Sequence, residues 1–193
     1  MTVSDELAKW LEQEESSAQR KLADVDLVIE SNFSESDIHR LQTFYGAAVA
    51  RLRAEGMKPS ELIAKFPALT LTILVGHAAL SYDSGRYWES FWIDMGQERK
   101  QVFENELRSS VNRLVEGFGL RSVASIQPVQ MLGMHAGLPS HCMSDVVGVV
   151  VEHLRRGRRA TGSAVFEWLW APGKEYRQNS LDKPVRNFFH YGG

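Results

Sequence analysis

Four residues of the kinds that bind metal ions or act as nucleophiles fall within a short stretch: His135, His141, Cys142 and Asp145. Zinc binding requires several such side chains to converge at about 2.0–2.3 Å from the ion. Their spacing matches no familiar zinc pattern. Cys142 and His141 are adjacent, so on a helix they would point in different directions and not act as nucleophile and base. A helix start with a small buried thiol explains the stretch, and we expect no metal and no cofactor.

An aromatic passage is the second group of interest, with five rings in the eleven residues 82–92. Tyr87, Trp88, Phe91 and Trp92 stand at the helical positions i, i+1, i+4 and i+5 and would form one broad face. Such a face could bind a partner helix, or the bases of a single strand if basic groups lay nearby, and we assign partner binding to these four residues. Aromatic side chains at helical spacing are more often buried, so core packing is the alternative.

Arginine side chains cluster around Gly157. Their planar guanidinium groups bind phosphate well, and residues 152–193 hold 8 basic against 4 acidic side chains, so this end of the chain could bind a polyanion such as nucleic acid. The residues assigned to this role are Arg155, Arg156, Arg158, Arg159, Lys174 and Arg177. Cations also stabilise the C-terminus of a helix, an interpretation that suits the first two arginines better than the next two.

Familiar catalytic motifs do not occur in the sequence. It has no phosphate-binding glycine loop, no dinucleotide-binding glycine pattern, no His-Glu-x-x-His and no Gly-x-Ser-x-Gly. Carboxylates such as Glu89 and Asp94 could meet His77 or His135 across helices, but spacing alone does not decide this. The chain is therefore not expected to be an enzyme, and an unfamiliar helical active site around Asp83, His135 and His141 is the lesser alternative.

Helices must position all of these groups, because apolar residues recur at helical spacing along most of the chain. The predicted helices cover residues 1–30, 35–55, 59–65, 67–82, 103–118, 127–136 and 143–154. Ser34 with Asp37 is a typical start for the second helix, and Gly56 is a typical end. The last helix is expected to be buried despite its run of valines. No Asn-Gly or Asp-Gly hairpin turn occurs, which argues against a β-rich fold.

These patterns predict an all-α fold, a compact multi-helix domain of about eight to ten helices. Residues 1–32 are expected to form a partly exposed N-terminal helix. Residues 33–193 are expected to form a single helical domain, itself the N-terminal module of a longer protein.

No membrane span is expected. The longest apolar run, Ala68 to Leu80, is thirteen residues long, whereas about 20 are needed to cross a bilayer. The N-terminus begins with acidic residues and lacks the basic and apolar regions of a signal peptide. The single cysteine, Cys142, cannot form an internal disulfide, which favours the reducing cytoplasm.

Two segments resemble a known group of proteins: Tyr82-Asp83-x-Gly85-x-Tyr87-Trp88-x-x-Phe91-Trp92, and Met134-His135-Ala136-Gly137-Leu138-Pro139 followed by an apolar helix. They are similar to the N-terminal helical region of large, poorly characterised actinobacterial and other bacterial proteins associated with mobile elements or phage defence. The resemblance covers roughly residues 40–190 and implies that the chain is the N-terminal module of a longer protein. It implies no catalytic residues, and the turn reads Gly-Leu-Pro where Gly-Ile-Pro would be expected.

The all-α pattern, the absence of catalytic motifs and the uneven charge predict a helical protein-interaction or regulatory module, non-enzymatic, in a bacterial multi-component system. A link to defence or mobile elements is implied by the resemblance alone. A protein partner is expected, and the alternative is a nucleic-acid-binding protein that uses the cluster Arg155–Arg159. Residues 1–57, with 11 acidic against 6 basic side chains, form the opposite, acidic end of the chain.

Overall fold

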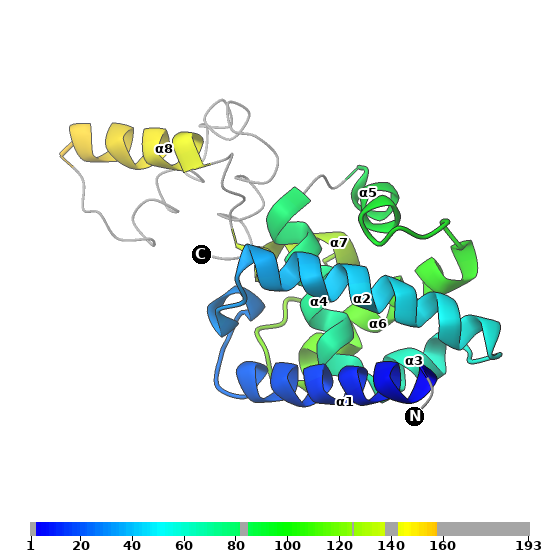
Figure 1. Cartoon of the computed structure of the whole chain (residues 1–193). Helices are drawn as coiled ribbons and strands as arrows, with labels where there is room; N and C mark the ends of the chain where they lie inside the picture. The colour runs from blue at the N-terminus through cyan, green and yellow to red at the C-terminus, as the bar shows by residue number, and fades with distance from the viewer. Residues whose placement is uncertain (1–2, 82–84, 125, 138–142, 158–193) are drawn as a thin grey trace.

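The structure is a computed structural model that describes residues 3–81, 85–124, 126–137 and 143–157. Within these ranges it contains eight α-helices, one 3₁₀ helix and no strand, which confirms the all-α prediction (Figure 1). The elements are α1 (Val3–Leu22), η1 (Val28–Ser31), α2 (Glu35–Ala54), α3 (Pro59–Lys65), α4 (Pro67–Ser81), α5 (Tyr87–Asp94), α6 (Gln101–Gly117), α7 (Pro128–Ala136) and α8 (Met143–Arg155).

Helix α4 lies at the centre of the bundle and packs against α1, α2, α5, α6 and α7 (Figure 1). Every residue from Ala68 to Ala78 is buried. A helix that is apolar on all sides must be covered on all sides, so the longest apolar run of the sequence is the core helix. Among the described residues no single helix is long and apolar enough to cross a membrane; α3 and α4 reach that composition only as a pair, with a bend of 100° between them.

The N-terminus of α4 is capped by a side chain from α1. Helix α4 begins at Pro67, which has no N–H, and Glu15 accepts the next two N–H groups. Its carboxylate oxygens lie 3.1 Å from the amide nitrogen of Ala68 and 2.8 Å from that of Leu69. Gln19 donates its side-chain amide to the same carboxylate. Glu15 is buried at the positive end of the α4 dipole, so it pairs backbone groups that no water could reach.

Helix α1 contributes to the same core as the other helices. Its buried apolar residues in that core are Leu11, Ala18 and Leu22. The helix is shorter than predicted, since it ends at Leu22 and not near residue 30. Glu30 explains the difference: its carboxylate accepts the N–H groups of Asp26 and Leu27 at 2.9 and 3.0 Å, and so starts η1 in place of a continued helix.

Helix α2 starts as predicted and then passes close to α4. Ser34 Oγ accepts the N–H of Asp37 at 3.1 Å, and the carboxylate of Asp37 accepts the N–H of Ser34 at the same distance. Gly76 permits the close approach to α4, because a Cβ there would overlap the side chain of Ile38. Gly46 of α2 permits a similarly close approach to the end of α5, because a Cβ at Gly46 would overlap the backbone carbonyl oxygen of the residue that follows α5. These two glycines set the position of α2.

Helix α8 lies apart from the bundle that α1 to α7 form (Figure 1). Its bounds confirm the helix predicted for residues 143–154. The prediction that this helix is buried is wrong for one of its faces, because Val151 and Leu154 are exposed. The valine run indicated only that the helix has an apolar face, and burial depends on whether another element covers that face.

Candidate functional site

The four aromatic residues of α5 that were assigned to partner binding lie in the core. Tyr87, Trp88, Phe91 and Trp92 are each at most 4% exposed. Their rings meet edge to face, with centroids 4.9 Å apart for Tyr87 and Trp88 and 5.6 Å apart for Phe91 and Trp92. Such pairs stabilise a fold by about 0.5–1.5 kcal/mol beyond their burial. Core packing accounts for these rings, and they offer no exposed face to a partner.

The buried carboxylate of Glu104, on α6, binds two arginine side chains next to this aromatic cluster. Glu104 accepts the indole N–H of Trp92 at 3.2 Å. Arg99 and Arg108 each donate two N–H groups to it, at 2.7–3.0 Å. Burial alone would raise the pKa of Glu104, but these hydrogen bonds outweigh it and hold the pKa below its usual value. With five donors around it, the carboxylate has no position left for a ligand.

His135 is a structural side chain and is not placed to act as a ligand or a base. Its Nε2 lies 2.9 Å from the carbonyl oxygen of Arg121, and its Nδ1 lies 3.4 Å from the backbone nitrogen of Val28. Burial lowers the pKa of His135 to about 4, so the ring is neutral at pH 7. Nε2 then donates and Nδ1 accepts, and both nitrogens serve to join α7 to η1 and to the loop after α6.

The described residues contain no group of three or more His, Cys, Asp or Glu side chains that could hold a metal ion. His141, Cys142 and Asp83 lie outside the described residues, and so does the side chain of Asp145. An active site around Asp83, His135 and His141 would lack a free imidazole at His135, because both of its nitrogens are bonded.

A second buried histidine, His77 of α4, brings together two residues of α5. Its Nε2 lies 3.0 Å from the hydroxyl oxygen of Ser90, and its Nδ1 lies 3.2 Å from a carboxylate oxygen of Asp94. The side-chain amide of Gln42, on α2, lies 3.4 Å from the same Nδ1. We call these four residues the His77 cluster. His77 is fully buried, Ser90 is partly buried, and the Asp94 side chain is 37% exposed.

A hydroxyl, an imidazole and a carboxylate in this order form the arrangement that activates a serine nucleophile. Burial lowers the pKa of His77 although the charge of Asp94 opposes that change, so the ring is neutral at pH 7 and able to accept a proton. The rings of Tyr87 and Phe91 cover the imidazole, with centroids 5.0 and 5.5 Å from its own. Among the described residues this cluster has the geometry closest to a reactive centre.

Part of the His77 cluster could be predicted from the sequence. Ser90 and Asp94 are four residues apart, so a helix places them on one face. His77 is the single ionisable residue in the apolar run 68–80, and a buried polar group of that kind requires a polar partner. The crossing of α4 and α5, which brings the two halves together, is a tertiary contact that spacing along one chain segment does not contain.

The predicted polyanion site is described only in part. Arg155 and Arg156 are exposed at the C-terminal end of α8. Arg156 pairs with Glu152 one turn earlier, with Nη2 and Oε1 2.6 Å apart. The remaining four residues, Arg158, Arg159, Lys174 and Arg177, lie outside the described residues.

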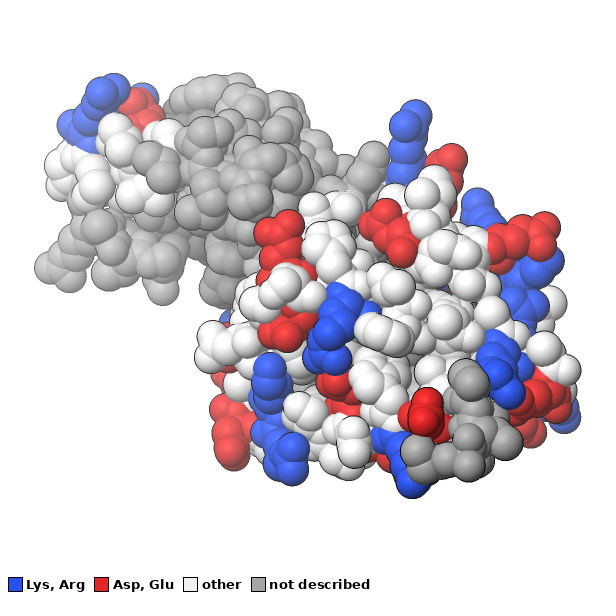
Figure 2. All heavy atoms as spheres, viewed as in Figure 1, with Lys and Arg blue, Asp and Glu red and all other residues white. Residues whose placement is uncertain are grey.

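The solvent-facing side of α8 is apolar beside Arg155. Val151 is 37% exposed and Leu154 is 45% exposed. On a helix Val151 has Leu154 (i+3) as its neighbour on one side and Arg155 (i+4) on the other. Val149 and His153 lie on the opposite side and are buried. We call Val151, Leu154 and Arg155 the α8 face. On the body of the molecule, by contrast, acidic and basic side chains are interspersed over the face seen in Figure 2.

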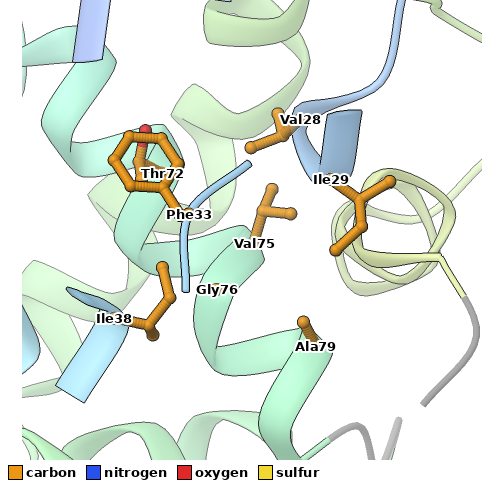
Figure 3. Close-up of a pocket in the computed structure, with 8 residues that line it drawn as sticks. All are labelled: Val28, Ile29, Phe33, Ile38, Thr72, Val75, Gly76 and Ala79. Carbon is orange, nitrogen blue, oxygen red and sulfur yellow. The ribbon is translucent and has the colours of Figure 1, made fainter. Parts of the chain in front are cut away.

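A small apolar recess lies between η1, α2 and α4 (Figure 3). Its lining consists of Val28, Ile29, Phe33, Ile38, Thr72, Val75, Gly76 and Ala79. The hydroxyl of Thr72 is buried and makes no hydrogen bond within the described part of the chain. The cavity volume of about 30 Å³ has room for one or two water molecules and for no larger ligand. The recess is therefore a packing gap beside the close crossing of α2 and α4.

Comparison with family models, with curated proteins and with solved structures found no match to this chain.

Proposed function

We propose that the protein is a helical interaction module that binds a protein partner through the α8 face. The observation that supports this proposal is the exposure of Val151 and Leu154, side by side, on a helix that lies apart from the bundle. Large apolar side chains exposed at positions i and i+3 of an amphipathic helix are the anchors that fit an apolar groove on a partner.

The chemistry of the partner follows from the residue beside these anchors. Arg155 stands one turn after Val151 on the same face. The C-terminus of α8 also carries Arg156, although Glu152 pairs with it. A positive rim around apolar anchors complements an acidic rim around an apolar groove, which speeds association and selects against basic surfaces. We therefore propose an acidic protein surface with an apolar groove as the partner.

Nucleic acid is the other class of partner that the arginines suggest. Phosphate contacts require cations and give no role to exposed aliphatic side chains. Val151 and Leu154 occupy the face that Arg155 shares, and Arg156 is already paired. These observations favour a protein partner, and nucleic acid becomes an outcome that the experiment can reveal.

The cellular setting that we propose is a bacterial multi-component system in the cytoplasm, with a link to mobile elements or phage defence. The link is supported only by the resemblance of the segments at 82–92 and 134–139. The cytoplasm is supported by the single cysteine of the chain.

Substitution of the anchors tests the proposal. We expect Val151→Ser/Leu154→Ser to weaken partner binding about tenfold or more, because two interface anchors lose their apolar contacts. The measurement is capture from a lysate of the source organism, quantified by mass spectrometry for wild type and variant. Calorimetry with the purified captured protein then follows. Both substituted side chains are exposed, so circular dichroism should show an unchanged fold.

The matched control is Val102→Ser, which removes an exposed valine from α6, where the side chain is 72% exposed. This variant should bind the partner like wild type. Equal capture by the α8 variant and the wild type would contradict the proposal. Capture that disappears after nuclease treatment, or that falls steeply with salt, would assign the arginines to nucleic acid instead.

A further inference from the structure

We propose that Ser90, His77 and Asp94 form a nucleophilic serine centre that transfers the acyl group of a small ester to water. This activity goes beyond partner binding and uses residues of α4 and α5, none of which belongs to the α8 face. Ser90 would be the nucleophile and His77 the base. Asp94 would be a positioning residue that acts through His77.

The tautomer of His77 decides whether the centre can react. Two side chains lie within hydrogen-bonding distance of Nδ1. The carboxylate of Asp94 can only accept a hydrogen bond, whereas the amide nitrogen of Gln42 can only donate one. The carboxylate is charged and closer, at 3.2 Å against 3.4 Å. The imidazole also has a hydrogen bond to the backbone of Tyr87. Charge-assisted contacts are the stronger ones, so we assign the proton to Nδ1, where it faces Asp94. Nε2 then carries the lone pair and faces Ser90.

The hydroxyl of Ser90 has three acceptors within reach. The closest is Nε2 of His77 at 3.0 Å, followed by the carbonyl oxygens of Tyr87 at 3.1 Å and Arg86 at 3.3 Å. The two carbonyls belong to the preceding turn of the same helix, where a serine hydroxyl bonds by default. His77 adds an acceptor that can also take the proton away, which a carbonyl cannot do. Ser90 is partly exposed.

The surface next to Ser90 indicates the class of substrate. Ile93 stands three residues later, on the adjoining turn, and is 70% exposed. The other large side chains of α5, such as Phe91 and Trp92, are buried. An exposed isoleucine beside the nucleophile would contact an apolar acyl chain, and the small contact area suits a short one. The proposed substrates are therefore esters of short aliphatic acids.

The reaction balances with water as the only co-reactant. Ser90 Oγ attacks the ester carbonyl carbon while its proton passes to Nε2 of His77. The ester C–O bond breaks, the alcohol leaves with the proton from His77, and the acyl group remains on Ser90. Water then attacks the acyl carbon and gives a proton to His77. The bond to Ser90 breaks, the proton returns to Oγ, and the carboxylic acid is released.

A fluorophosphonate probe tests the centre on the full-length protein, because Oγ displaces fluoride from phosphorus and forms a stable adduct. We expect peptide mass spectrometry to find the adduct on Ser90, with no adduct there in Ser90→Ala. General-base assistance accelerates such a step about 100-fold or more, so Ser90 should react at least that much faster than Ser109. Ser109 is an exposed helical serine whose hydroxyl bonds only to its own helix at the Glu106 carbonyl. Hydrolysis of p-nitrophenyl butyrate should be lost together with the adduct.

The role of Asp94 has its own readouts. Asp94→Asn should slow labelling at least about tenfold, because an amide no longer holds the proton on Nδ1, and Asp94→Glu should restore part of the rate. Nitrogen NMR of wild-type His77 should show the proton on Nδ1. Ser109→Ala and Val151→Ser/Leu154→Ser should label Ser90 at the wild-type rate, which separates this proposal from partner binding through the α8 face.

Three labelling results would overturn the proposal. These are no adduct on Ser90, a rate at Ser90 equal to that at Ser109, and an unchanged rate in a folded Asp94→Asn variant. A proton found on Nε2 of His77 would equally overturn it, since Ser90 would then accept a hydrogen bond from His77 and could not give its proton to it.

Discussion

Glu104 of α6 joins this helix to α5 through the indole of Trp92. It pairs two guanidinium groups and one indole N–H in a buried position. The burial of Glu104 could be predicted from the sequence. Leu107 and Val111 follow at i+3 and i+7, which places Glu104 on the apolar face of an amphipathic helix. Arg108 at i+4 could be named as its partner from spacing alone, whereas Trp92 and Arg99 could not.

Removal of this carboxylate should destabilise the protein strongly. We expect Glu104→Ala to lower the free energy of unfolding by about 3 kcal/mol, because the indole N–H of Trp92 stays buried without an acceptor and two arginines lose their counter-charge. Urea denaturation followed by tryptophan fluorescence measures the change. The control, Glu116→Ala, removes an exposed carboxylate from the same helix and should change the stability by less than about 0.5 kcal/mol. Equal effects of the two substitutions would refute this account.

Among the elements, α4 shows how much of a helix can be predicted and how much cannot. Its apolar run and the start at Pro67 are local features, and the predicted end near residue 82 differs little from Ser81. Its cap is not local, because Glu15 lies 53 residues before Ala68. The charged helix α1 therefore contains one carboxylate whose role depends on tertiary structure, and nothing in its own segment distinguishes that carboxylate from its neighbours.

Loss of this cap should weaken the central helix. We expect Glu15→Ala to lower the free energy of unfolding by about 2 kcal/mol, since two buried N–H groups lose their acceptor at the positive end of a helix. Glu15→Gln keeps one acceptor oxygen and should lose less. Glu12→Ala, on the exposed side of α1, is the control and should be nearly neutral. Chemical denaturation at one fixed pH measures all three, and a neutral Glu15→Ala would disprove the capping role.

For the whole molecule, two buried histidines, His135 and His77, make stability depend on pH. The pKa of His135 is about 4 in the folded protein, against 6.5 for the ordinary group. Between these values the unfolded chain binds a proton that the folded protein does not, so stability rises with pH in this window. The folded state has its full stability from this group above pH 6.5 and loses it as the pH falls toward 4. His77 acts in the same direction, since burial lowers its pKa as well.

The expected loss from His135 is about 3 kcal/mol between pH 6.5 and 4, at 1.36 kcal/mol per pKa unit. Urea denaturation at pH 7, 6, 5 and 4 measures it. His135→Gln should flatten the pH dependence, although it also lowers stability at pH 7 because one of two hydrogen bonds is lost. His39→Ala is the control, because His39 is exposed on α2. An unchanged pH dependence in His135→Gln would show that other groups cause the acid sensitivity.

The overall architecture could be predicted from local patterns to a large extent. The all-α class, the capping box at Ser34 and the bounds of α3 and α7 follow from spacing, proline and glycine. The burial of the aromatic residues of α5 and the exposure of Val151 could not be decided locally. Both depend on which element covers which face, and a face has the same composition whether or not it is covered.

The cap on α4 has a consequence for synthesis on the ribosome. The chain emerges from its N-terminus, so α1, with Glu15, is outside before Pro67 and the most apolar helix appear. Glu15 can therefore accept the first N–H groups of α4 as soon as α4 is made. The apolar side of α1 is available at the same time to cover one side of α4. The helices that follow later, α5 to α7, cover the remaining sides of α4.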